Sequence, residues 1–423
     1  MNPSLRLRLR LALRNLIRQR RRTLLSGAAM VVGMALLVFS RALAEGGHED
    51  WIEAGVRLGS GHVSVQAPEY RRQRALEHRM SNDDRRVVEA ALAEPGVASR
   101  LVAEAPRLAV QGLASSASSA LPVGVTGVDP NSEQGFSLLP ERLEAGRYLE
   151  PDDRLHAYVG ARLAERLDLE PGDRFVLTAQ DASGDIVGQM ARVVGTFRTG
   201  IPEADEALVQ IPLHTAQEWL GVPGDVTSID LLLESSRAVR PVLASLEATL
   251  AGGSNSVVTL DWREAQPALD AAVRMDDWAD YVFHTILFGI AALAIINTIL
   301  MSVMQRTREF GVLRALGLRR AEVGRLVFAE GMLLTIVSGF AGMLLGLAVV
   351  WLFFRDGLDF SSLMREEMTA AGVVIDPVIV PRFHPTQIAQ SLFFILSIGI
   401  LASIYPAWRA TRIDVAEAMK FSE

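Results

Sequence analysis

Residues 304–331 read MQRTREFGVLRALGLRRAEVGRLVFAEG, and this stretch decides how the rest of the chain is interpreted. It is basic, and its apolar residues recur at helical spacing, which predicts a short amphipathic helix. Gly317 stands where a residue in the left-handed conformation would end that helix. Because long apolar segments lie on both sides, we expect this helix at a membrane surface, presented to a partner. The alternative is an ordinary basic loop on the cytoplasmic side.

The composition is typical of a membrane protein. Half of the 423 residues are hydrophobic, and the absence of cysteine excludes disulfides, thiolate metal sites and thiol nucleophiles. Residues 1–44 carry nine Arg and no acidic residue, whereas residues 45–280 carry 21 Arg and 38 acidic residues. Since basic residues near membrane ends favour the cytoplasmic side, the acidic part is predicted to lie outside the cytoplasm. Its negative charge argues against nucleic acid as a partner.

The hydropathy pattern predicts a fold class: four transmembrane α-helices with a large α+β periplasmic domain between the first and second spans. Both termini are expected in the cytoplasm. The predicted layout begins with a cytoplasmic amphipathic helix at 1–23 and a first span at 24–44, followed by the periplasmic domain with stalk helices at 45–280. The other spans are predicted at 281–304, 326–354 and 388–408. They are joined by a coupling loop at 305–325 and a short periplasmic loop at 355–387, and a cytoplasmic tail follows at 409–423. In the third span, Gly342 and Gly346 are spaced for close helix packing. A cleaved signal peptide ending near residue 44 is the alternative for the first span.

The predicted periplasmic domain alternates strand and helix patterns. Its ends, 49–58 and 264–280, are expected to continue the neighbouring spans as helices. Strands are predicted at 62–66, 101–111, 121–128, 174–179, 187–197 and 227–233, helices at 82–94 and 159–167, and a mobile loop at 112–120. Ser81 or Asn82 is expected to cap the first of these helices.

The sequence predicts no catalytic, metal or cofactor site. Lys420 is the only lysine and lies outside any G-x-x-x-x-G-K pattern, so a phosphate-binding P-loop is absent from this sequence. The hydrolase motifs H-E-x-x-H and G-x-S-x-G are also absent, and the seven His residues lack ligand spacing. If ATP drives this protein, a partner subunit must bind it.

Polar and aromatic residues near the predicted spans are the remaining candidates. Glu330 is expected to pair with a nearby Arg such as Arg325 or Arg14 rather than carry protons, and Asn297 to bridge helices or to be satisfied locally. Three tryptophans are expected to anchor the protein at the outer membrane interface: Trp51, Trp262 and Trp278. The alternative is a hydrophobic ligand site near the stalks that includes Trp51, Trp278 and His284.

Residues 306–317 resemble the conserved segment of the FtsX-like permease family, the type VII ABC transporter permeases. Further similar stretches are Ala12–Leu16 with Arg22–Thr23 before the first span, Tyr405–Ala410 at the end of the last span, and Gly127–Pro130, Gly146–Arg147, Val159–Gly160, Leu163–Ala164 and Pro171–Asp173 in a MacB-type periplasmic domain. One departure is Val415 after Asp414, where the family usually has Pro. This difference affects only the predicted turn near residue 415.

The resemblance implies a permease that acts by mechanotransmission in a bacterial inner membrane and works with a cytoplasmic ABC ATPase dimer. The residues implied to contact the ATPase are Arg308, Glu309, Phe310, Gly311, Leu313, Arg314 and Leu316. Other implied partners are a second permease subunit, identical or different, a periplasmic lipoprotein carrier or membrane-fusion protein, and membrane lipids. Extraction of a lipoprotein is the expected function. The alternatives are tripartite efflux of hydrophobic toxins or peptides, FtsX-like regulation of an extracytoplasmic hydrolase, and peptide sensing.

Overall fold

The computed structural model describes residues 20–200, 202–250, 256–359, 369–370, 373–374, 378–383 and 385–412. The chain divides into two compact units. The first, here called the membrane unit, comprises Met1–Glu49, Asp276–Leu363 and Pro377–Glu423. The second, here called the outer unit, comprises Asp50–Met275 and Met364–Asp376.

The outer unit is built on one mixed sheet. Among the described residues its ten strands follow the order β10-β1-β9-β2-β3-β8-β5-β7-β4, and β6 pairs with β2 and β7. The strands are β1 Val63–Gln66, β2 Leu101–Ser115, β3 Ala120–Val128, β4 Leu143–Gly146, β5 His156–Gly160, β6 Arg174–Gln180, β7 Ile186–Phe197, β8 Leu208–Pro212, β9 Ser228–Leu233 and β10 Val258–Asp261. The β3–β8 and β5–β7 pairs are parallel and the others antiparallel. This confirms the predicted α+β class.

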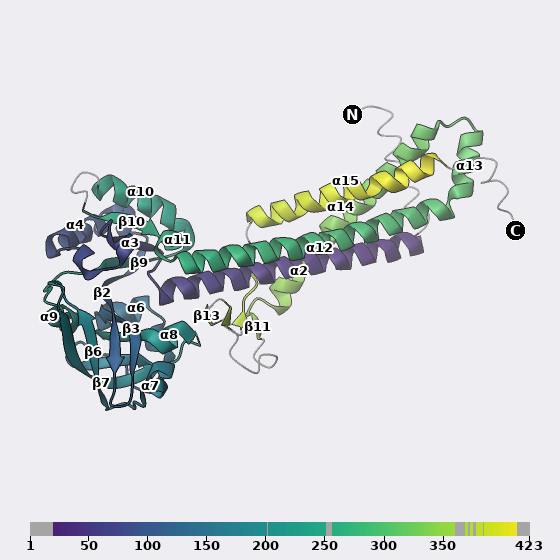
Figure 1. Ribbon diagram of the computed structural model, residues 1–423. Helices are drawn as coiled ribbons and strands as arrows, with labels where there is room; N and C mark the ends of the chain where they lie inside the picture. Colours follow the sequence, from purple (N-terminus) through teal and green to yellow (C-terminus); the bar gives the residue numbers. More distant parts are fainter. Residues whose placement is uncertain are drawn as a thin grey trace. The chain divides into compact units, whose positions relative to one another are not determined.

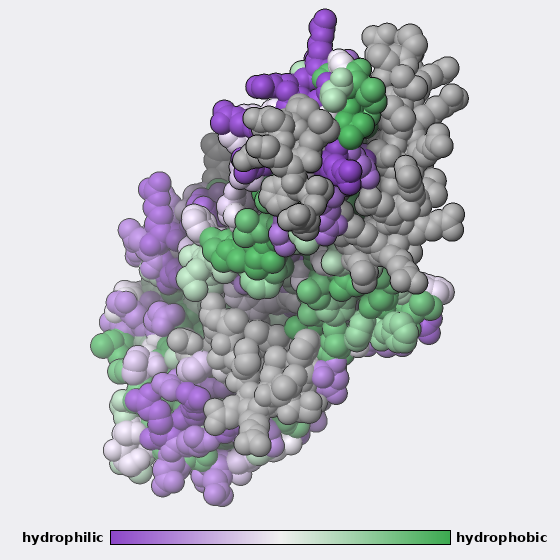
Figure 2. All heavy atoms as spheres, turned by 90° about the vertical axis from the view of Figure 1, so that its right-hand side faces the viewer, coloured by the Kyte–Doolittle hydropathy of each residue, from purple (hydrophilic) through white to green (hydrophobic). Residues whose placement is uncertain are grey.

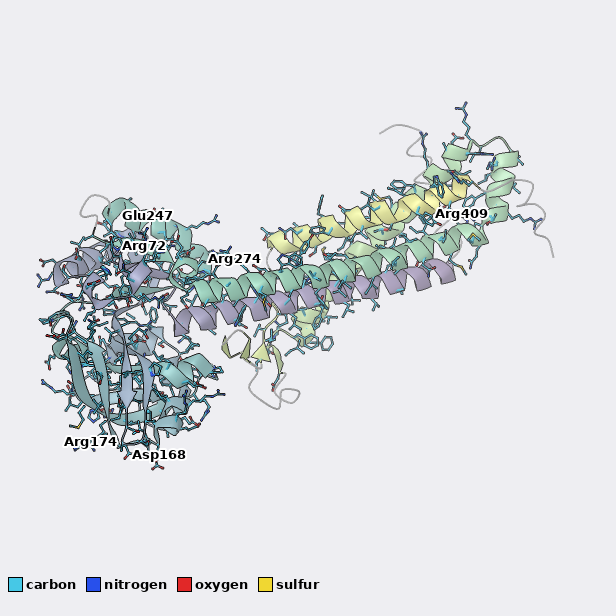
Figure 3. The ribbon with its side chains drawn as sticks, viewed as in Figure 1. Arg72, Asp168, Arg174, Glu247, Arg274 and Arg409 are labelled. Carbon is cyan, nitrogen blue, oxygen red and sulfur yellow. The ribbon has the colours of Figure 1, made fainter. Side chains whose placement is uncertain are left out.

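Short helices accompany the sheet. They are α3 Tyr70–Gln73, α4 Asn82–Leu92, α5 Pro95–Ala98, α6 Pro130–Phe136, α7 Ala161–Leu167, α8 Pro202–Ala207, α9 Leu213–Trp219, α10 Val239–Leu250 and α11 Trp262–Ala265. Ser81 caps α4 as predicted, because its Oγ accepts a hydrogen bond from the Asp84 amide at 3.2 Å while the Asp84 carboxylate accepts from the Ser81 amide. Charged side chains such as Asp168, Arg174 and Glu247 project outward from this unit (Figure 3).

Two sequence predictions in the outer unit are partly wrong. The predicted loop at 112–120 is mostly strand, because residues 112–115 pair with β3 on one side and with β6 on the other. The predicted helix at 159–167 begins only at Ala161, since the preceding residues form β5 between β7 and β8. The strands β6, in the first case, and β7 and β8, in the second, come from distant parts of the sequence.

The membrane unit contains the long helices (Figure 1). These are α2 Arg20–Leu58, α12 Pro267–Gln305, α13 Thr307–Ala315, α14 Arg320–Phe353 and α15 Pro385–Thr411, of which α2 and α12 continue into the outer unit. This unit also contains a short strand pair, β11 Leu358–Asp359 with β14 Val378–Ile379, whereas the pair of β12 Thr369–Ala370 with β13 Val373–Val374 belongs to the outer unit. Within the described ranges, four helical segments are long and apolar enough to cross a membrane: Gly27–Leu58, Pro267–Gln305, Arg320–Phe353 and Ile388–Thr411. The four-span fold is thereby confirmed, while most of the helix predicted at 1–23 lies outside the described residues.

Two glycines let α14 approach α2 closely, as their spacing predicted. A Cβ atom on Gly342 would lie 2.5 Å from the Cβ of Met34, and one on Gly346 would lie 2.9 Å from the carbonyl oxygen of Ala35. Larger side chains cannot occupy either position without moving a helix.

Replacing Gly342 with Leu is therefore expected to destabilise the membrane unit by about 1–3 kcal/mol, because the added atoms overpack the contact with α2. Gly289→Leu is the matched control, since no atom lies within 4 Å of a Cβ atom at Gly289 on α12. Thermal unfolding of the purified chain in detergent should show a lower midpoint for Gly342→Leu alone. Equal midpoints for the two variants would contradict the close packing.

Candidate coupling site

The predicted amphipathic helix is present as α13, which lies between α12 and α14 (Figure 1). Arg306 separates α12 from α13, with φ −106° and ψ 16°. Phe310 is 1% exposed and belongs to the same hydrophobic cluster as Val303 of α12 and Val323 of α14. One face of α13 is therefore fixed to the membrane unit by apolar packing.

The end of α13 is equally well defined. Gly317 has φ +102°, which confirms the predicted left-handed cap. Its amide donates to the Arg314 carbonyl at 3.0 Å, and the Leu318 amide donates to the Leu313 carbonyl at 3.1 Å. This pair of bonds is the Schellman motif, which satisfies carbonyls that a helix end otherwise leaves unbonded. The turn from α13 into α14 is short and internally bonded.

The opposite face of α13 is exposed. It carries Arg308, Glu309, Val312 and Leu316, of which Leu316 is 77% exposed. The end of the membrane unit that contains α13 faces the viewer in Figure 2. Hydrophobic and hydrophilic side chains are both present on that surface. An exposed apolar pair beside charged residues is typical of a protein contact surface.

The residues predicted to contact a partner fall into three groups by exposure. Arg308, Glu309 and Leu316 are exposed, and Leu313 and Arg314 are half-buried. Phe310 and Gly311 are buried, because the helical period turns them toward the spans. A contact role for these two is not supported by their burial, and they anchor the helix instead. Val312 joins the exposed face, although the sequence prediction did not include it.

An ion network centred on the buried Arg306 joins α13 to α14 directly after the last residue of α12. Arg306 is 7% exposed; its Nη1 donates to Glu330 Oε2 of α14 at 2.7 Å, and its Nε donates to Glu309 Oε2 of α13 at 2.8 Å. The guanidinium also lies 5.2 Å from the centre of the Phe310 ring. The expectation that Glu330 pairs with an arginine is confirmed. The arginine is Arg306 rather than the exposed Arg325, and Arg14 lies outside the described residues.

The other predicted residues lie in different environments. Asn297 is on an exposed face of α12, which does not support a bridge between the described helices. Trp51 and Trp262 are 7% and 2% exposed and belong to a hydrophobic cluster of the outer unit, so the prediction that they anchor at a membrane surface is wrong. In the membrane unit, Trp278 is 69% exposed, and His284 is buried with its Nδ1 2.9 Å from Asp280 Oδ1.

A second ion network, which no sequence motif indicates, lies in the outer unit. Arg107 Nε and Nη2 donate to the two carboxylate oxygens of Glu133 at 2.6 and 3.0 Å, and Nη1 lies 3.3 Å from Asp230 Oδ2. Arg107 also donates to the carbonyl of Gly59, the residue directly after α2. Burial raises the pKa of Asp230 to about 6, although the Arg107 charge and the Ser64 hydroxyl lower it. These residues are far apart in the chain, so no local motif reveals them.

Comparison with known proteins agrees with this architecture. Residues 281–415, which contain α13 and three of the apolar helices, match the model described as FtsX-like permease C-terminal. This part of the chain is similar to the FtsX-like permease family. The lipoprotein-releasing system transmembrane protein LolC of Xylella fastidiosa is 24% identical over 71% of this chain and 73% of its own length, and LolC of Neisseria meningitidis is 23% identical over 76% and 78%.

A further relative of this permease is the macrolide export ATP-binding/permease protein MacB of Shewanella oneidensis, 21% identical over 97% of this chain and 60% of that protein. Among solved structures, the periplasmic region of MacB from Actinobacillus actinomycetemcomitans matches 48% of this chain and 90% of that one, with 13% identity and a TM-score of 0.34. The family-model match, the LolC relatives and the four apolar helices support an ABC permease of a bacterial inner membrane with a periplasmic domain.

Proposed function

We propose that this permease couples ATP hydrolysis by a separate cytoplasmic ABC ATPase dimer to the extraction of a lipoprotein from the periplasmic side of the inner membrane. The observation that carries the coupling role is α13, a short helix with one buried face and one exposed face that includes Val312 and Leu316. The exposed face offers the ATPase an apolar contact rimmed by charge. The names of the LolC relatives support a lipoprotein as the substrate.

The ion network explains how α13 would pass on a displacement. Arg306 binds carboxylates of both α13 and α14 and directly follows the last residue of α12. Because packed interiors are nearly incompressible, a push on α13 moves both neighbouring helices rather than being absorbed locally. Both α2 and α12 are continuous over 39 residues, so a movement at one end of either helix is carried along its length.

Asn297 supports a second permease subunit as a partner. Its amide is on an exposed face of α12, within a segment apolar enough to cross a membrane. An amide that faces lipid loses its hydrogen bonds, whereas a second helix can supply them. We place both chain termini in the cytoplasm and expect a periplasmic lipoprotein carrier to receive the substrate.

The double variant Val312→Glu with Leu316→Glu is expected to lose its ATPase, because carboxylates replace the apolar contact surface. The wild-type chain, purified from its native membrane in mild detergent, should retain a protein that contains G-x-x-x-x-G-K-[ST] when analysed by mass spectrometry. Recovery of that protein should fall at least about tenfold in the variant, which corresponds to about 1.4 kcal/mol. Ile186→Glu is the control, since Ile186 is 81% exposed on the outer unit. Unchanged recovery would contradict the role of α13.

Tripartite efflux is a second candidate function, favoured by the MacB relative, which aligns over 97% of this chain. The same purification distinguishes lipoprotein extraction from efflux. Bound lipoproteins or a lipoprotein carrier support extraction, whereas a membrane-fusion protein supports efflux.

A further inference from the structure

His48 of α2 lies between two carboxylates of α12, the helix that runs beside it (Figure 1). The His48 Nδ1 atom is 2.8 Å from Asp276 Oδ2, and the His48 Nε2 atom is 3.5 Å from Asp277 Oδ1. All three residues belong to the membrane unit. The His48 side chain is 21% exposed, so the ring can exchange protons with water while it joins α2 to α12.

The geometry around His48 suits the protonated ring. A neutral imidazole has one N–H donor and one nitrogen with a lone pair, whereas an imidazolium ion has two N–H donors. An ionised carboxylate only accepts hydrogen bonds. Since both ring nitrogens face carboxylate oxygens, a neutral ring would direct its lone pair at one of them. Histidine side chains commonly change their charge between about pH 5 and pH 8.

The surroundings of His48 are acidic. On the adjoining turns of α2 and α12, and on the segment bonded to α2, the other charged or titratable residues are Arg41, Glu45, Glu49, Asp50, Arg274, Asp280, His284 and Arg382. Arg274 and Arg382 already bind other carboxylates. Asp280 interacts electrostatically with both His48 and Arg41. If the His48 ring loses its proton, acidic residues of the two helices face each other without this bridging charge, and like charges repel.

Packing inside the membrane leaves α2 and α12 room to move. A cavity of about 50 Å³ lies between α2, α12 and α14, and its walls include Gly33 and Met34 of α2 and Ala291 and Ala294 of α12. Cavities larger than a water molecule are few in protein interiors. Because apolar contacts do not fill the space between the two helices, charges beyond the apolar runs can change the distance between them.

We propose that His48, Asp276 and Asp277 form a proton-dependent clasp between α2 and α12. The clasp closes when His48 is protonated and opens when the ring is neutral, so it weakens as the pH rises from about 5 to about 8. It lies outside the apolar runs 24–40 and 281–304, on the side of the outer unit. The inference goes beyond the proposed function, since it requires neither the ATPase nor a transported substrate.

The test measures the distance between α2 and α12 in the full chain at about pH 5.5 and about pH 8, on either side of the range in which histidine commonly titrates. Because the chain has no cysteine, Ala44→Cys and Ala279→Cys place spin labels at two exposed positions, one on each helix. The labelled chain is reconstituted in nanodiscs and diluted with unlabelled chain, so that electron paramagnetic resonance reports distances within one chain. The ratio of the short-distance to the long-distance population should be about fivefold lower at the higher pH, the factor that one partly exposed ion pair provides.

Three variants of the labelled chain identify the titrating group. His48→Gln should favour the long distance at both pH values, and His48→Arg should keep the short distance at both, because arginine stays charged. His78→Gln is the matched control, since the His78 side chain is 22% exposed and 3.3 Å from Glu77 but lies in the outer unit. This control should respond to pH as the wild type does. The proposal is overturned if the wild type shows the same populations at both pH values, or if His48→Gln retains the pH dependence of the wild type.

Discussion

Replacing Arg306 with Gln is expected to release α13 from the membrane unit. The substitution removes the ion pair of Arg306 with the Glu330 carboxylate, which is 11% exposed, and the ion pair of Arg306 with Glu309. Removing one partner of a buried ion pair typically costs about 3–5 kcal/mol. Amide hydrogen exchange in residues 307–315 of the full chain in nanodiscs should accelerate by at least about a hundredfold, because protection follows the free energy of local opening.

A charge exchange and a surface variant make this prediction specific. Arg306→Glu combined with Glu330→Arg should recover part of the protection, since an opposite-charge pair is restored. Arg308→Gln, on the exposed face of the same helix, should leave the exchange rates unchanged. If Arg306→Gln behaves like Arg308→Gln, then apolar packing by Phe310 alone holds α13, and the ion network has no part in coupling.

Replacing Arg107 with Met is expected to destabilise the outer unit strongly. Glu133 and Asp230 are 0% and 2% exposed, so the change leaves two buried carboxylates close together without a cation. The cost should be about 3–5 kcal/mol. For a domain of this size it lowers the unfolding midpoint by roughly 6–20 °C, and the fluorescence of the buried Trp51 and Trp262 can follow it.

The control for Arg107 is Arg147→Met. Arg147 also binds a buried carboxylate through two nitrogens, since both of its bonds to Asp153 are 2.8 Å, but the Arg147 side chain is 42% exposed and the Glu150 amide also donates to Asp153. Partly exposed pairs contribute about 1 kcal/mol or less. A triple variant in which Arg107, Glu133 and Asp230 become Met, Gln and Asn should recover much of the lost stability, because it no longer buries unpaired charge. A midpoint shift no larger than that of Arg147→Met would show that the network is not a source of stability.

The sequence was sufficient to predict a structural feature where that feature depends only on the residues that form it. The cap at Ser81, the left-handed Gly317 and the close approach at Gly342 follow from side-chain size or backbone freedom, and the structure agrees with each. Long apolar runs likewise predict the spans. These features need no knowledge of distant partners.

Predictions were wrong where distant partners decide the outcome. The small residues at 112–115 are typical of a loop, but they pair with β3 on one side and with β6 on the other and therefore form part of strand β2. Trp51 stands near a predicted membrane surface, yet the cluster with Phe136 and Leu269 buries it in the outer unit. The pairing of Arg306 with Glu330 depends on the turn between two helices, which spacing alone does not define.

The placement of β1 also determines how the outer unit can be made. The first strand of the ten-stranded sheet lies between β9 and β10, the last two strands of that sheet to be synthesised, and Val63 faces Leu231 on one side and Asp261 on the other. The sheet therefore cannot be completed until the chain has crossed the membrane as far as residue 261. Pairings between sequence-distant strands also form slowly. Until β10 pairs with β1, the unfinished sheet has an open strand edge, which is a site where chains can aggregate.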